Sequence, residues 1–311
     1  MNIQYSRRSF LGSVGALTAT AAARSSSASI AGKALEKAQL QFGYTAMTWG
    51  KQERQAIDDI SSLGFPGIQF RADAFSEFKP EELRDLLHQH KLTLVALSSG
   101  DLDLDLPTGT DPLAVHITHA KFVQQVGGLY LQVLDRLKPY PRTVTPDECN
   151  RLGKLLTELG KRTNDLGVKL GYHNHLNTIS EHPDNLQRVL DVIDPRYVHL
   201  ELDTAHYVAG GGDPAQAILR YHDNLLFLHL KDVVDIPVNT AGSQYPFRFV
   251  ELGQGIVNLP QVFAALDRVQ FKGWAVVELD RVPDNTRTPK QCAEISKNYL
   301  ENTVSRQLGG L

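Results

Sequence analysis

Val168-Lys169-Leu170-Gly171-Tyr172-His173-Asn174-His175 is a short, mostly apolar run that ends in two histidines. Residues two apart in a β-strand face the same side, so both imidazoles would share one face. Three later runs also end in metal-capable or acid/base side chains: Leu200–His206, Leu226–Asp232 and Val276–Asp280. Because the pattern recurs four times, it predicts a functional site that is assembled at strand ends.

Outward from this stretch, apolar runs alternate with amphipathic segments that carry helix-start and helix-stop residues. The expected strands are residues 42–48, 67–71, 92–98, 129–134, 168–173, 198–203, 225–230 and 274–279. The expected helices are residues 52–63, 80–90, 111–126, 145–166, 183–192, 213–221, 259–269 and 289–304. Eight strand–helix pairs with apolar strands predict an α/β fold, a single-domain (β/α)8 TIM barrel over residues 38–306. The alternative is an open doubly wound sheet, but Trp49-Gly50-Lys51 lacks the glycine-rich turn typical of that fold.

The composition of the chain excludes some classes of protein. The chain has 311 residues and a formal net charge of -3, which gives no general attraction to nucleic acid or to an anionic membrane. Its two cysteines, Cys149 and Cys292, are too few for a disulfide framework, so we expect two free thiols.

The N-terminus carries a candidate export signal. Ser6-Arg7-Arg8-Ser9-Phe10-Leu11-Gly12 resembles a twin-arginine signal, and a weakly apolar run follows it. That run is shorter than the roughly 20 apolar residues that span a bilayer, so no stable membrane span is expected. We therefore predict a signal segment over residues 1–32 and a mature protein in the periplasm or otherwise exported. A disordered or amphipathic arm is the alternative.

Chemistry in a TIM barrel takes place at the C-terminal ends of the strands. The side chains expected there on strands five to eight are His173, His175, Asp203, His229 and Glu278. Such a set suits a divalent metal, for which Mn²⁺, Co²⁺, Zn²⁺, Fe²⁺ and Mg²⁺ are candidates, acting as a Lewis acid. Simpler explanations exist: Asp203 could cap the next turn, His229 could be a packing residue, and Glu278 could pair with Lys231.

The long segment 233–258 follows the seventh strand and is expected to overhang the mouth of the barrel. Within it, Arg248 is a candidate to bind a substrate oxygen. Trp49, after the first strand, is a candidate to stack on a sugar ring, and ordinary loop packing is the alternative for both. His116 and His119 fall on an expected helix, on what we predict to be its outer face.

Four motifs resemble the sugar phosphate isomerase/epimerase superfamily, which has xylose-isomerase-like TIM barrels. They are Leu202-Asp203-Thr204-Ala205-His206, His229-Leu230-Lys231-Asp232, Gly253-Gln254-Gly255 and Val277-Glu278-Leu279-Asp280. The resemblance covers residues 40–304, and the superfamily includes ketose 3-epimerases, inosose dehydratases and AP endonucleases. It implies that Asp203, His229 and Glu278 are metal ligands. It also implies that His206 contacts substrate and that Lys231 binds substrate hydroxyls or stabilises an enolate.

Tyr172-His173-Asn174-His175 departs from the ketose epimerases, which have a glutamate at the end of the fifth strand as ligand and acid/base. The stretch is closer to the Tyr-His-His-His of inosose dehydratases and to uncharacterised relatives with Tyr-His-Asn-His. His173 or His175 then replaces that glutamate. A metal-bound nitrogen cannot also accept a proton, so we expect ligand and base to be different residues and leave their assignment open.

The resemblance implies proton transfer next to a carbonyl of an unphosphorylated sugar or cyclitol. Glu278, His173, His175 and Lys231 are the expected catalytic residues, with His173 also a candidate ligand. Isomerisation or epimerisation is the expected outcome, and dehydration through the same enediolate is the alternative. Phosphodiester hydrolysis is disfavoured, because neither an Asp-x-His pair after the seventh strand nor a basic stripe is found, so no nucleic-acid partner is expected. A non-catalytic sugar-binding barrel and a homo-oligomeric state are left open.

Overall fold

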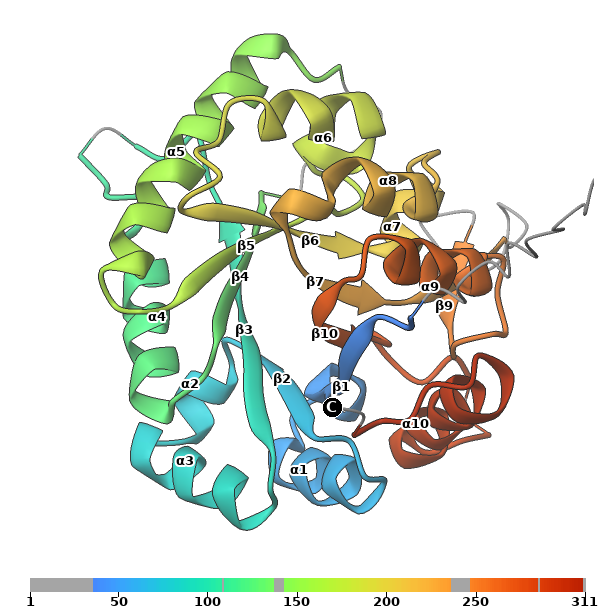
Figure 1. Ribbon diagram of the computed structural model, residues 1–311. Coiled ribbons are helices and arrows are strands. Elements are labelled where there is room, and N and C mark those ends of the chain that lie inside the picture. The colour runs from blue at the N-terminus through green and yellow to red at the C-terminus, as the bar shows by residue number, and fades with distance from the viewer. Residues whose placement is uncertain (1–35, 108, 137–142, 236–246, 285, 310–311) are drawn as a thin grey trace, which may run out of the picture. The chain divides into compact units, whose positions relative to one another are not determined.

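The computed structural model describes residues 36–107, 109–136, 143–235, 247–284 and 286–309. In these residues the chain forms a closed barrel of eight strands with helices around it (Figure 1), which confirms the predicted (β/α)8 fold. The predicted signal segment, residues 1–32, lies outside the described residues. Within the described ranges, every helix is too short or too polar to cross a membrane.

All barrel strands run parallel and pair with their neighbours along the chain. They are β1 (Gln39–Thr45), β2 (Gly67–Arg71), β3 (Thr93–Leu102), β4 (Tyr130–Asp135), β5 (Lys169–His173), β6 (Val198–Asp203), β7 (Leu225–Leu230) and β10 (Lys272–Val277). The barrel closes where β1 pairs with β10. The first strand ends earlier than predicted, because residues 46–49 turn into the 3₁₀ helix η1 (Ala46–Trp49).

The helices cover the outside of the barrel. They are α1 (Glu53–Ser62), α2 (Ala74–Glu77), α3 (Pro80–Gln89), α4 (Ala114–Val126), α5 (Pro146–Asn164), α6 (Pro183–Leu190), α7 (Thr204–Ala209), α8 (Pro214–Tyr221), α9 (Leu259–Arg268) and α10 (Pro289–Asn298), which continues as the π-helical turn η4 (Tyr299–Thr303). Two further 3₁₀ turns are η2 (Ile179–Glu181) and η3 (His222–Asn224). Thr145 and Thr288 begin α5 and α10 with capping boxes, which satisfy N–H groups that a helix start leaves unpaired.

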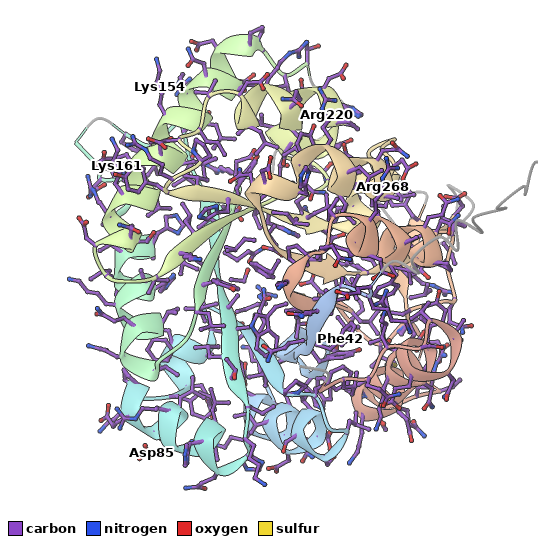
Figure 2. All side chains as sticks on the ribbon, in the orientation of Figure 1. Phe42, Asp85, Lys154, Lys161, Arg220 and Arg268 are labelled. Carbon is purple, nitrogen blue, oxygen red and sulfur yellow. The ribbon has the colours of Figure 1, made fainter. Side chains whose placement is uncertain are left out.

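The barrel interior is apolar at the end opposite the site. Phe227 stacks on Tyr130 with ring centroids 5.2 Å apart, and Trp274 fills the space beside Gly67. A Cβ on Gly67 would lie 2.4 Å from the Trp274 ring, so only glycine fits there. Outside the barrel wall, Phe42 of β1 packs against Phe263 of α9. Lys154, Lys161, Arg220 and Arg268 are exposed on the helices (Figure 2). The polar side chains lie at the other end of the barrel, where the strands end.

His116 and His119 of α4 are buried, so the prediction that they lie on an outer face is wrong. Ser99 Oγ lies 2.6 Å from His116 Nδ1 and 2.8 Å from His119 Nδ1. Both histidines share a helix face with Ala120 and Val123, which packs onto the barrel. Cys149 and Cys292 are buried free thiols, as predicted.

The segment after β7 is not a plain loop. β8 (Asp232–Asp235) and β9 (Phe247–Val250) form a two-stranded antiparallel sheet, and residues 236–246 between them lie outside the described residues. The Asp232 carboxylate then accepts four backbone N–H groups, those of Val233, Gly253, Gly255 and Val257, at 2.9–3.0 Å. A Cβ on Gly255 would lie 2.2 Å from Asp232 Oδ1, which explains the glycine in Gly-Gln-Gly.

Candidate metal centre

Four buried side chains from neighbouring strands meet at the C-terminal mouth of the barrel. His173 ends β5, Asp203 ends β6, His229 lies near the end of β7, and Glu278 follows β10. One ligand atom from each lies within 4.8 Å of the others. None of the four is more than 4% exposed. Parallel pairing brings the strand ends to one level, with Asp203 opposite His229, and this creates the cluster.

One carboxylate oxygen of this cluster has no hydrogen-bond partner among the described residues. Asp203 Oδ1 accepts the N–H of His206 at 2.8 Å and caps α7, so the capping role considered for Asp203 is real. Asp203 Oδ2 is buried and makes no hydrogen bond to any described residue, and the buried His229 Nδ1 lies 2.9 Å from Glu278 Oε2. Buried polar atoms are rarely left without a partner. Two imidazoles and two buried carboxylates whose ligand atoms converge fit a divalent metal, which these four residues would hold.

The electrostatics of the cluster also favour a cation. Burial acts to lower the pKa of His229, but the carboxylates of Glu201 and Glu278 outweigh it and hold that pKa well above its usual value. Burial acts to raise the pKa of Glu278, but His229 and Lys231 hold it well below its usual value. Burial raises the pKa of Asp203 to about 6. Without a metal, the His229 imidazolium therefore supplies positive charge among the carboxylates.

Lys231 lies beside the cluster and is 1% exposed. Its Nζ lies 3.1 Å from Glu278 Oε2, 2.5 Å from Asp280 Oδ1 and 3.2 Å from His206 Nε2. Burial acts to lower the pKa of Lys231, but its acidic neighbours, Asp280 first, outweigh that effect and raise it. Lys231 is therefore an ammonium ion, and Glu278 takes part in both an ion pair and the four-residue cluster.

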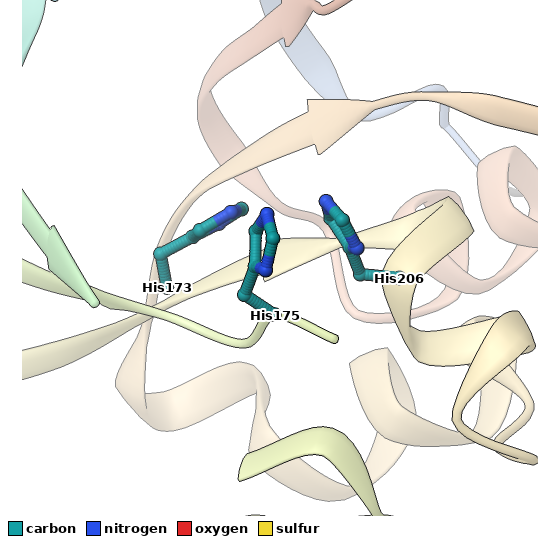
Figure 3. A group of neighbouring side chains, drawn as sticks. All are labelled: His173, His175 and His206. Carbon is teal, nitrogen blue, oxygen red and sulfur yellow. The ribbon is translucent and has the colours of Figure 1, made fainter. Parts of the chain in front are cut away.

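Three histidines lie side by side, and one of them, His173, belongs to the metal cluster. Figure 3 shows His175 between His173 and His206, and the His175 and His206 ring centroids are 3.7 Å apart. Burial lowers the pKa of His175 to about 3 and that of His206 well below its usual value, so both rings are neutral near pH 7. Ligand atoms of the three also lie within 4.8 Å of one another, but the Lys231 ammonium beside His206 opposes a second cation there.

His173 and His175 therefore occupy different positions, although they are two residues apart. His173 belongs to the four-residue cluster, and His175 lies beside it, half-buried. His175 Nδ1 lies 2.7 Å from the carbonyl oxygen of Leu176. A carbonyl oxygen only accepts, so Nδ1 of the neutral ring carries the proton and Nε2 has the free lone pair.

The segment after β7 contacts the site through Phe249, which sequence reasoning missed. The Phe249 ring centroid is 4.9 Å from that of His206 and 4.2 Å from Lys231 Nζ. Arg248, the residue considered from sequence, is exposed on the same short strand. Adjacent strand residues face opposite sides, so Arg248 points away from the side that Phe249 occupies. The alternation Phe-Arg-Phe-Val was the signal for this strand.

Glu201 is the second residue that sequence reasoning missed. It lies two residues before Asp203 on β6, on the same strand face, and is completely buried. Its Oε1 is 3.3 Å from His173 Nδ1 and 2.9 Å from His229 Nε2. Gln69 Oε1 of β2 is also 2.9 Å from His229 Nε2. These two residues form the layer directly beneath the metal cluster.

Trp49 has packing contacts in the described structure. It is 4% exposed, its indole N–H donates to Asp59 Oδ2 at 2.9 Å, and its ring meets the edge of Tyr44. The expected stacking of Trp49 on a sugar ring stays a prediction.

Comparisons with known proteins agree with this architecture. A family model described as a xylose isomerase-like TIM barrel matches residues 57–299. An inosose dehydratase of Geobacillus kaustophilus is 28% identical over 274 residues, which cover 82% of this chain and 88% of that protein. One of Lacticaseibacillus casei is 25% identical over 303 residues, which cover 86% and 98%.

Solved structures of the same fold include the IOLI protein with a binding zinc atom. It has a TM-score of 0.70 at 18% identity and covers 85% of this chain and 98% of its own. The 3-keto-D-glucoside 4-epimerase of E. coli has a TM-score of 0.67 at 16% identity and covers 85% and 99%. The family match extends over most of the barrel and includes strands β5 to β10, which carry the cluster. The chain therefore belongs to the xylose isomerase-like TIM barrel family.

Proposed function

We propose that this protein is a divalent-metal-dependent enzyme that dehydrates a keto-sugar or keto-cyclitol without a phosphate group. The observation that carries the proposal is the buried His173, Asp203, His229 and Glu278 cluster with the Lys231 ammonium beside it. The inosose dehydratases among its relatives support a cyclitol or sugar substrate and loss of water.

The neighbouring side chains have distinct roles in this proposal. When bound, the metal would act as a Lewis acid on the substrate carbonyl. His175 is neutral and has its Nε2 lone pair free, so it removes the α-proton as general base. Lys231 stabilises negative charge that develops on the enolate oxygen. His206 binds a substrate hydroxyl group.

Elimination then balances within the substrate. The electron pair of the broken C–H bond forms a C=C bond, and the β C–O bond breaks. The proton that His175 took returns to the departing hydroxyl, which leaves as water. Glu278 is the alternative base, because its carboxylate lies in the same cluster.

Isomerisation or epimerisation is the second candidate. It uses the same first step, and the proton then returns to a different carbon or face. The neighbouring His206 ring favours this candidate, since it places a second neutral imidazole beside His175, with ring centroids 3.7 Å apart. His173 disfavours it, because an imidazole occupies the strand end where the two-glutamate epimerase mechanism needs a carboxylate.

Metal analysis and isotope exchange test the function. We expect purified wild-type protein to contain divalent metal, and Asp203→Asn and His229→Gln to lose it, whereas the exposed-site control His222→Gln retains it. The metal-loaded enzyme in D₂O, given inososes, 3-keto-glycosides or ketoses, should release an unsaturated ketone from one class. Deuterium in recovered substrate or isomer without dehydration would identify the second candidate. Metal retained in both cluster variants would refute the site assignment.

We also propose export through the twin-arginine route, on the strength of residues 6–12 alone. Cell fractionation of the full chain tests it, with Arg7→Lys/Arg8→Lys as the variant. Equal periplasmic amounts of the two proteins would contradict export by this route.

A further inference from the structure

Glu201 is a carboxylate in the interior of the barrel, where packed side chains are normally apolar. It is 0% exposed; its Oε1 contacts ring nitrogens of two histidines, and its Oε2 makes no hydrogen bond to any described residue. Gly171 lies beside it, where a Cβ would be in ordinary contact with the Glu201 Cβ at 3.5 Å but tight against the Phe227 ring at 3.1 Å. Burial of a carboxylate is costly unless the group is paired, so the side chains that contact Glu201 decide its role.

The close cationic or N–H partners of Glu201 are two imidazoles of the metal cluster. His173 presents Nδ1 at 3.3 Å, and His229 presents Nε2 at 2.9 Å. The two histidines thus point opposite ring nitrogens at the same carboxylate. A neutral imidazole has one N–H and one lone pair, so the N–H directed to Glu201 decides which nitrogen can bind metal.

The consequence differs for the two rings. An N–H at His229 Nε2 leaves Nδ1 as the lone-pair nitrogen, and Nδ1 is the atom that lies 2.9 Å from Glu278 Oε2 within the cluster. An N–H at His173 Nδ1 leaves Nε2 as its ligand atom. A carboxylate that accepts the N–H of a metal-bound histidine also makes the other ring nitrogen a stronger ligand for the metal. One carboxylate serves two ligands here.

We propose that Glu201 is a positioning residue of the metal centre. It sets the tautomers of His173 and His229 and thereby raises the affinity of the site for metal. The proposal rests on the metal-dependent function proposed above. Gln69 assists at His229 alone, because its Oε1 accepts only from that ring among the described contacts.

Glu201→Gln tests the proposal, since it keeps the shape and removes the charge. We expect the dissociation constant for Co²⁺ to rise about 10–100-fold, as for other carboxylates behind metal-bound histidines. The visible d–d absorbance of bound Co²⁺ should change as well, because the ligand field of two imidazoles changes. Glu251→Gln is the matched control, as Glu251 is 2% exposed but pairs with Arg287 at 3.2 Å and not with the cluster.

A charge exchange gives the second arm. His173→Glu alone sets a carboxylate directly against Glu201 and should weaken binding further or prevent folding. His173→Glu/Glu201→Gln moves the negative charge from beneath the cluster into it, so metal affinity should recover relative to either single variant. Such non-additivity is expected only if the two positions act as one unit.

The outcomes separate the two proposals. Wild type that binds no Co²⁺ overturns the metal-dependent function and the role of Glu201 together. Wild type and Glu201→Gln with equal affinity and equal spectra overturn the role of Glu201 alone. If Glu201→Gln does not fold, Glu201→Asp replaces it: the shorter side chain withdraws the carboxylate from the rings, and unchanged Co²⁺ affinity would then refute the proposal.

Discussion

Asp232 joins the segment after β7 to the barrel, and its substitution should couple a stability defect to an activity defect. Oδ1 accepts the N–H groups of Val233 and Val257, and Oδ2 accepts those of Gly253 and Gly255. Asp232→Asn keeps one oxygen and puts an amide NH₂ in place of the other. Two of the four hydrogen bonds are lost, and two backbone donors then face a donor.

The expected magnitude follows from this count. A hydrogen bond to a charged acceptor contributes about 1.5–3 kcal/mol, so losing two lowers the free energy of unfolding by about 4 kcal/mol. The segment lies at the surface of the barrel mouth, so part of the loss should appear as local opening. Because β9 carries Phe249 to His206 and Lys231, kcat/KM should fall while the metal content stays unchanged.

Urea denaturation and hydrogen exchange measure the two parts. Amide exchange at Gly253 and Gly255 should accelerate in Asp232→Asn, and the denaturation midpoint should fall. Asp235→Asn is the control, because Asp235 is an exposed residue at the end of the same strand. Wild-type stability with unchanged exchange at both glycines would show that the carboxylate does not hold the segment.

Three further predictions concern the site and the fold. His173→Gln should lose bound metal, whereas His175→Gln should retain it and lose turnover, as metal analysis beside steady-state kinetics will show. Lys231→Met should remove the ammonium partner of the buried Glu278 and the half-buried Asp280 carboxylates, lowering the free energy of unfolding by about 3–5 kcal/mol and abolishing turnover with metal still bound; unchanged stability contradicts this. Burial lowers the pKa of His116 to about 4, below its unfolded value of about 6.5, so the unfolded chain binds the extra proton. Stability should therefore fall as pH drops through that window, by up to about 3 kcal/mol, and His116→Gln should flatten this part of the urea-denaturation pH profile.

The strand-end residues could be predicted because they interrupt an otherwise apolar pattern. Asp203, His229 and Glu278 each follow a run of buried residues, and parallel strands bring such ends together. The same rule does not distinguish His173 from His175, because residues two apart in a strand face the same side. Only the turn that begins after β5 at His173 separates them, and its course depends on tertiary contacts such as Asn174 with the backbone of Asp203.

The missed residues show where local patterns stop being informative. Glu201 lies on the same strand face as Asp203, so it could have been placed inside the barrel. The neighbouring sequence does not reveal that two histidines from other strands contact it. Phe249 depends on a β8–β9 pairing across a long connection, which short-range signals do not specify. His116 and His119 had the correct helical spacing for a buried face. They were nevertheless placed outside because they are polar. Ser99, the hydrogen-bond partner that allows both to be buried, lies on a strand and cannot be identified from the helix sequence.

The charge balance at the barrel mouth bears on the substrate. Glu201, Asp203, Glu278 and Asp280 contribute four carboxylates. Lys231, a permanent cation, is already paired with the last three. A divalent metal that displaces the His229 proton adds one net positive charge, which leaves these groups negative in total. A substrate phosphate would enter against that field, whereas a neutral keto-sugar or keto-cyclitol would not. Negative charge that forms on such a substrate develops only after binding, beside the Lys231 ammonium, where it is stabilised in the transition state rather than in the bound ground state.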